Sequence, residues 1–138
     1  MKTILVTLFL VLITPLAEAQ SFRYTGTARA YSVEGVVYDL ALPISVNTTF
    51  AKSGRNYKYR SASGVRATLT PQGSGAYQGV TNWMLAYDLR GILCAYRTLI
   101  TSGNFGSSRI NLFASVESLC DDGAYGILRY KASLRRAR

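Results

Sequence analysis

The chain has 138 residues, a formal net charge of +9 at pH 7 and no histidine. A basic surface of this size favours anionic partners such as nucleic acid, lipopolysaccharide, acidic glycans, anionic membranes or an acidic protein, although it can also serve solubility alone. Without histidine, imidazole-based triads and zinc sites are excluded. No nucleophile elbow, phosphate-binding loop or metal-ligand spacing occurs, so we expect no metal and no cofactor.

The first 19 residues have the pattern of a secretory signal peptide. Lys2 precedes an apolar run over residues 4–13, and Ala17-Glu18-Ala19 forms a small-residue cleavage motif. The run is too short to span a bilayer, which takes about 20 residues. We therefore expect residues 1–19 to be removed, residues 20–138 to form a single domain, and the mature protein to be secreted or periplasmic without a transmembrane segment.

Alternation of apolar and polar residues predicts strands through most of the mature chain. The glycine-rich segment 71–79 is predicted to be a loop, and no window outside the leader has a helical period. Eight or nine strands with tight turns predict a small all-β antiparallel barrel or sandwich. The predicted strands cover residues 22–31, 33–42, 44–51, 55–61, 65–70, 83–89, 92–100, 110–116 and 125–134.

One predicted strand combines cations with tyrosines and is the candidate binding segment. Tyrosines on one face of a strand can stack on bases or sugar rings, while flanking cations meet phosphates or acidic glycans. In the alternative interpretation, the tyrosines face the core and the cations are only solvated. The candidate binding residues are Arg55, Tyr57, Lys58, Tyr59 and Arg60.

Residues 82–101 contain the only tryptophan and the densest apolar run after the leader. Two alternating stretches meet at Arg90-Gly91, which predicts a hairpin at the centre of the core. The residues expected to form that core are Trp83, Leu85, Tyr87 and Ile92.

Cys94 and Cys120 are the only cysteines. In an exported domain, two cysteines predict one disulfide. A thiol catalyst or a metal-binding pair is the alternative, and the lack of a nearby imidazole disfavours it.

Catalytic candidates are limited to carboxylates and tyrosines. A shift of 49 residues aligns Tyr38-Asp39-Leu40 with Tyr87-Asp88-Leu89, so Asp39 and Asp88 could approach each other if this weak repeat is real. Similar strand composition explains the repeat equally well. Asp121 and Asp122 offer too few oxygens for calcium, which takes 6–8.

These observations predict a non-catalytic, exported β-barrel binding protein, of the inhibitor or immunity type or one that binds a polyanion or anionic surface. The alternative is a calycin-like carrier of a small apolar ligand, and a carboxylate- or tyrosine-dependent hydrolase or isomerase is third. The chain is barely long enough for an eight-stranded outer-membrane barrel, and cations opposite the core positions interrupt the apolar band that such a barrel needs.

Overall fold

The computed structural model describes residues 20–37 and 43–138. The predicted signal peptide and Asp39 lie outside the described residues. Within the described ranges, no helix has the length and apolar character required to cross a membrane.

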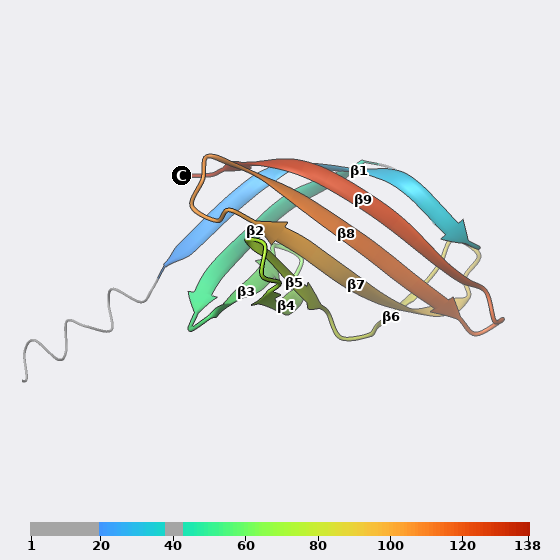
Figure 1. Cartoon of the computed structure of the whole chain (residues 1–138). Helices are drawn as coiled ribbons and strands as arrows, with labels where there is room; N and C mark the ends of the chain where they lie inside the picture. Colours follow the sequence, from blue (N-terminus) through green and yellow to red (C-terminus); the bar gives the residue numbers. More distant parts are fainter. Residues whose placement is uncertain (1–19, 38–42) are drawn as a thin grey trace, which may run out of the picture.

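In the described part of the chain, nine strands form a single antiparallel sheet, and each pairs with its neighbours in the order β5-β4-β3-β2-β1-β9-β8-β7-β6 (Figure 1). Alternating side chains account for the strands of the barrel wall, because each of these has one inward and one outward face, whereas all four residues of β6 are exposed. The strands are β1 (Ser21–Gly35), β2 (Ile44–Ser53), β3 (Asn56–Ser61), β4 (Arg66–Pro71), β5 (Ala76–Val80), β6 (Met84–Tyr87), β7 (Leu93–Gly103), β8 (Arg109–Cys120) and β9 (Tyr125–Arg136).

The sheet closes into a barrel because β5 also pairs with β7. Eight strands form the closed wall. The additional strand β6 pairs with the first residues of β7, Leu93 to Tyr96. The connections run up and down between neighbours, as in a meander. The all-β prediction is confirmed, and of the two architectures expected from the sequence, the structure is the barrel.

Two predicted boundaries are wrong. Strand β1 continues past the expected break at Ser32 to Gly35, because a β-bulge between Ala30 and Ser32 absorbs the change of alternation. Residues 38–42 of the second predicted strand lie outside the described residues. The segment predicted as a loop contains β5. Glycine is required there, because a Cβ at Gly79 would collide with the backbone oxygen of Thr68 on β4.

One end of the barrel is filled by aromatic side chains. The Phe105 ring, from the β7–β8 turn, stacks on Phe50 with 4.4 Å between ring centroids, and lies equally close to the ring of Tyr57. The Tyr24 hydroxyl donates to the Ser107 carbonyl at 2.7 Å and accepts from the Gly106 amide at 2.9 Å. These contacts fix the turn over that end of the core.

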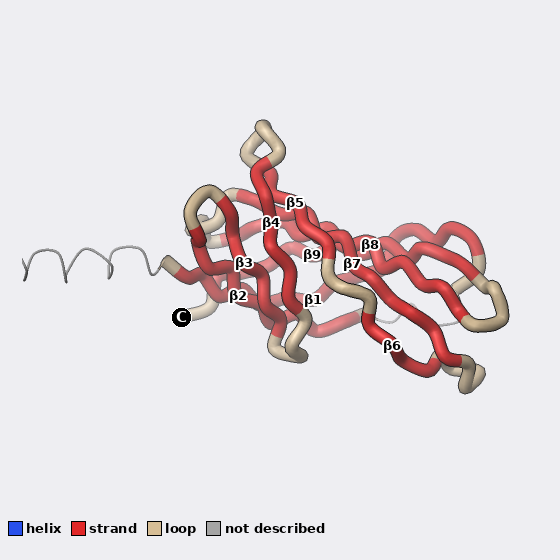
Figure 2. Tube along the Cα trace, turned by 90° about the horizontal axis from the view of Figure 1, so that it is seen from below, coloured by secondary structure: helices blue, strands red, loops and turns tan. Residues whose placement is uncertain are grey.

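At the other end, the long strands extend past the short ones as an open sheet. Strands β1, β8 and β9 have 15, 12 and 12 residues, whereas β3, β4 and β5 have six, six and five. Figure 2 shows β6 at the edge of this extension, away from β3 and β4. Below we call this the flared end, meaning the end that carries the β6–β7 and β8–β9 turns.

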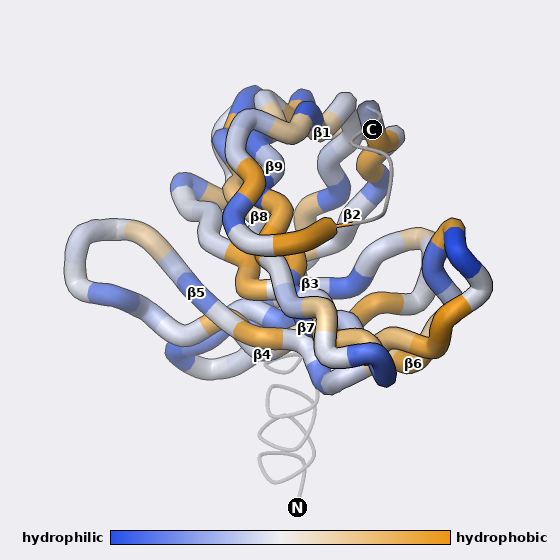
Figure 3. The backbone as a smooth tube through the Cα atoms, turned by 90° about the vertical axis from the view of Figure 1, so that its right-hand side faces the viewer, coloured by the Kyte–Doolittle hydropathy of each residue, from blue (hydrophilic) through white to orange (hydrophobic). Residues whose placement is uncertain are grey.

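The predicted hairpin exists, but its assignment to the core is wrong. Trp83, Leu85 and Tyr87 are 43%, 71% and 73% exposed, and Ile92 is half-buried. Strand β6 lies outside the closed wall, so neither of its faces meets the barrel interior. In Figure 3, where the tube is coloured by residue hydropathy, the hydrophobic (orange) strand β6 lies to one side of the barrel.

Cys94 and Cys120 form the predicted disulfide, which joins directly opposed residues of β7 and β8. Asp88 is buried beside it and accepts hydrogen bonds from the backbone amides of Arg90 and Ile92 at 2.8 and 3.1 Å. Burial raises the pKa of Asp88, but these amides and the Arg90 guanidinium outweigh burial and hold its pKa below the usual value. The disulfide and Asp88 therefore hold the β6–β7 turn on the barrel.

Candidate anion-binding face

Arg60 and Arg66 face each other directly across β3 and β4. Both side chains are exposed on the outer wall. Like charges placed directly opposite in an antiparallel pair destabilise it, and an anion beside them would offset this repulsion. No carboxylate among the described residues forms an ion pair with either arginine.

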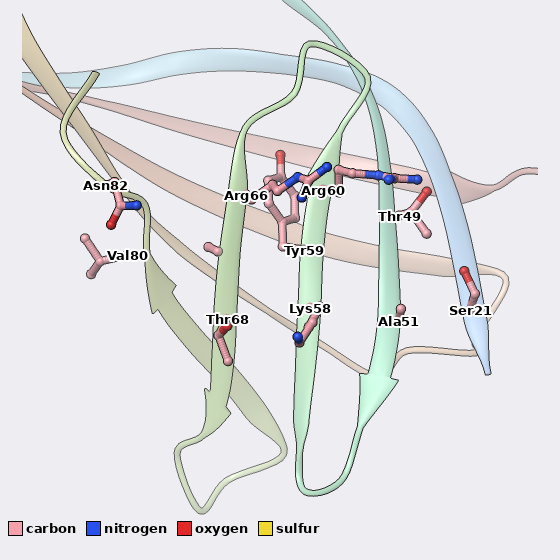
Figure 4. Close-up of a pocket in the computed structure, with 11 residues that line it drawn as sticks. Ser21, Thr49, Ala51, Lys58, Tyr59, Arg60, Arg66, Thr68, Val80 and Asn82 are labelled. Carbon is pink, nitrogen blue, oxygen red and sulfur yellow. The ribbon is translucent and has the colours of Figure 1, made fainter. Parts of the chain in front are cut away.

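These arginines border an open groove of about 660 Å³ on the outside of β2, β3 and β4. Figure 4 shows Arg60, Arg66 and Lys58 along it, with Tyr59 between the two arginines and small residues such as Thr49, Ala51 and Thr68 around them. The floor and edges are formed by Ser21, Thr49, Ala51, Tyr59, Ala67, Thr68, Val80 and Asn82. The groove is therefore a shallow, cationic surface rich in short hydroxyl and amide groups.

Two further cation pairs repeat this arrangement around the barrel. Arg29 on β1 is opposite Lys131 on β9, and Arg109 on β8 is opposite Arg135 on β9. All four side chains are exposed. Lys131 also lies over the ring of Tyr31, 5.6 Å from its centroid. Positive charge is thus concentrated on the outer wall from β8 through β9 and β1 to β4.

The carboxylates are segregated from these cations. Every described carboxylate side chain lies on the flared end or its turns, and most are already paired. Arg90 binds Asp88 and Asp122 at 2.8 and 2.6 Å. The remaining pairs are Arg97 with Glu117 at 2.7 Å and Arg129 with Glu34 at 3.1 Å.

Hydrogen bonding holds these carboxylates in the charged state. The Tyr125 hydroxyl and the Arg97 guanidinium hold the pKa of Glu117 below its usual value. Arg90 does the same for Asp122, and Arg129 for Glu34. Apart from the exposed Asp121, the described acidic groups are paired with arginines at the flared end, which leaves the opposed cations of the barrel wall available to an external anion.

The structure separates the residues of the candidate binding segment. Lys58 and Arg60 are exposed on the groove, and Arg55 is exposed in the β2–β3 turn. Tyr57 and Tyr59 are 8% and 9% exposed and belong to the core. They do not present stacking faces beside the cations, in agreement with the alternative interpretation of the alternation.

Sequence reasoning did not single out Arg66. Its importance comes from hairpin register, which places it opposite Arg60 across the Ser63-Gly64 turn. The signal was available, because the turn and the alternation of both flanking strands put the two arginines on one face.

A second cavity, of about 430 Å³, opens at the flared end of the barrel interior. Inward side chains of four strands surround it, and the carrier hypothesis required an apolar internal cavity of this kind. The lining includes Val46, Thr48, Tyr59, Val65, Ile100, Leu112 and Ala114. Three of the side chains expected in the core do not fill this interior, since Trp83, Leu85 and Tyr87 are exposed.

Asp88, Cys94 and Cys120 place one oxygen and two sulfurs within 4.8 Å of one another. Both sulfurs are joined in the disulfide. A metal would require thiolates, so this donor set fits a structural cross-link and not a metal centre. Asp39 lies outside the described residues, and its predicted approach to Asp88 remains a prediction.

Comparison of the chain with protein-family models, with curated proteins and with solved structures returned no match.

Proposed function

We propose that the protein is an exported, non-catalytic binding protein whose barrel wall binds an extended polyanion. The directly opposed pair Arg60/Arg66 is the observation that carries this proposal. An anion between the two guanidinium groups would replace their mutual repulsion by charge-assisted hydrogen bonds. The pairs Arg29/Lys131 and Arg109/Arg135 extend the same potential to other strands of the wall.

The chemistry of the groove favours an acidic polysaccharide over nucleic acid. Proteins that bind single strands without sequence preference stack bases on aromatic side chains. The groove offers Lys58, Arg60 and Arg66 but no exposed aromatic ring, because Tyr59 is buried. Its hydroxyl and amide groups, such as Thr49, Thr68 and Asn82, match the hydroxyl groups of a sugar chain.

Retention on immobilised heparin tests this proposal. The mature protein should bind at low ionic strength and elute as the salt concentration rises, because binding releases counterions. A sulfated glycan should compete more strongly than single-stranded DNA of the same charge. Elution in the low-salt wash would contradict the proposal, and stronger competition by DNA would contradict the choice of glycan.

A matched pair of double variants locates the binding surface. Arg60→Gln/Arg66→Gln removes two charges from the groove, whereas Lys52→Gln/Arg55→Gln removes two from the exposed β2–β3 turn region. Equal net charge means that an effect of total charge alone would shift both elution points equally. We expect a clearly earlier elution for the groove variant only.

A further inference from the structure

The cavity at the flared end lies in the barrel interior, shares only Tyr59 with the lining of the outer groove, and has features of a ligand site. Its volume of about 430 Å³ lies in the range of small-molecule pockets, roughly 300–1,000 Å³. Apolar side chains such as Val46, Ile100 and Leu112 form much of its wall. Because no lysine, arginine or carboxylate lines it, a charged ligand group would be buried without a partner there.

Two hydroxyl groups on the lining have no partner among the described residues. Thr48 is 2% exposed, and its Oγ1 is buried without a hydrogen bond. Tyr59 is 9% exposed, and no described residue hydrogen-bonds its hydroxyl. Leaving a buried hydroxyl unpaired costs about 1–3 kcal/mol, and this applies to Thr48 Oγ1. The Tyr59 hydroxyl is not a fully buried atom, and Tyr59 lines the open cavity.

The register places these two residues together. Thr48 is opposite Ser61, and Phe50 is opposite Tyr59, so Thr48 and Tyr59 are diagonal neighbours on the inward faces of β2 and β3. In Figure 4 the Tyr59 ring runs along the barrel, and its hydroxyl oxygen points towards the β3–β4 turn, where the cavity opens. Burial raises the pKa of Tyr59 to about 12, so this hydroxyl is a proton donor at neutral pH.

We infer that this cavity binds a small uncharged molecule with an apolar body and one oxygen acceptor, which receives a hydrogen bond from the Tyr59 hydroxyl. The apolar body packs against Ile100, Leu112 and Ala114. Thr48 supplies a second hydroxyl at the same polar spot. Ketones, aldehydes and esters have this chemistry, whereas fatty acids, which are ionised at neutral pH, do not.

Fluorescence titration with prodan, an uncharged naphthalene ketone, tests the inference. Its emission shifts to shorter wavelength when the ring system leaves water. Wild-type protein should bind it saturably with one site per chain. Tyr59→Phe removes only the donor and should weaken binding roughly 3- to 10-fold, as the loss of one neutral hydrogen bond does.

Ala114→Leu should abolish binding, because the added side chain occupies the cavity. Ala86→Leu adds the same group on the exposed strand β6 and should leave binding unchanged. Circular dichroism checks that each variant folds, and Val65→Phe, on the rim of the cavity, is a second filling variant. Heparin retention should be unchanged in Ala114→Leu, Val65→Phe and Ala86→Leu, because none of these residues lines the outer groove, and this separates the two sites.

Three results would overturn the inference. Absence of saturable binding to the wild type would show that the cavity takes no such ligand. Binding that survives both filling variants would place the probe elsewhere, for example on the apolar β6 hairpin. Binding that is lost on filling but unchanged in Tyr59→Phe would remove the donor and with it the ligand class.

Discussion

Arg60 and Arg66 are direct cross-strand partners on the outside of the barrel, and no described carboxylate pairs with either of them. The chain has enough acidic residues to neutralise such a pair, but those that the structure describes lie at the flared end, and all of them except Asp121 are paired with arginines there. The arrangement places like charges together on the wall, and an external anion is the partner that would relieve their repulsion.

Removal of one of these charges should stabilise the free protein. We expect Arg60→Gln to raise the free energy of unfolding by about 0.2–0.5 kcal/mol at low salt, because like charges directly opposite are destabilising. Urea unfolding at low and high salt measures this, and the gain should vanish at about 1 M salt, where exposed charges are screened. Lys58→Gln is the matched control, since its partners Ala51 and Thr68 are uncharged. A loss of stability in Arg60→Gln would contradict the repulsion.

Asp88 should make the protein sensitive to acid. Its pKa is lower in the folded protein than the usual value, so its contribution to stability is complete above the unfolded pKa, about 3.9, and is lost as the pH falls through the folded pKa. Asp88→Asn should therefore lower the urea midpoint at pH 7 and flatten its dependence on pH below about pH 4. Asp121→Asn, at an exposed residue without a described ion pair, should do neither. An unchanged pH profile in Asp88→Asn would refute this role.

The disulfide should stabilise the barrel without taking part in binding. Replacing both cysteines by alanine should lower the free energy of unfolding by about 3–4 kcal/mol on the chain-entropy model, given their separation of 26 residues. Chemical denaturation measures the loss. Because Cys94 and Cys120 lie away from the groove, heparin retention of the folded variant should match the wild type. A parallel loss of retention would indicate that the flared end belongs to the binding surface.

Thr48→Val should increase the stability of the ligand-free protein. Valine has the same shape as threonine and removes a buried hydroxyl without a described partner, so we expect a gain of about 1 kcal/mol. Thermal and urea unfolding check this result. Ser102→Ala is the contrasting variant, because the buried Ser102 hydroxyl donates to the Asn111 carbonyl at 2.7 Å, and its removal should destabilise the protein. Destabilisation by Thr48→Val would mean that the Thr48 hydroxyl has a hydrogen-bond partner in the wild-type protein.

Much of the fold could be predicted from alternation and from the cysteine count. Period-2 patterns locate β2, β3, β4, β7, β8 and β9, because each has one buried and one exposed face. Strand β5 was missed because its apolar pattern is weak and its glycine serves close approach to β4. Closure could not be predicted, since it depends on the pairing of β5 with β7 across the intervening β6 hairpin.

The wrong assignment of the β6–β7 hairpin to the core has a related cause. Alternation in Trp83, Leu85 and Tyr87 shows that two faces differ, but not whether another layer covers either face. Strands β5 and β6 share β7, which places β6 beyond the closed wall. For the candidate site, Lys58 and Arg60 were identified from composition, whereas the role of Arg66 required the register of its hairpin.

The most direct test of the proposed function is the salt dependence of binding to a heparin fragment of defined length. The slope of log K against log salt concentration reports the number of cations engaged, at about one per contact. Arg60→Gln/Arg66→Gln should make the slope shallower by about two, whereas Lys52→Gln/Arg55→Gln should leave it unchanged. Equal slopes for the wild type and the groove variant would contradict the claim that the opposed arginines bind the anion.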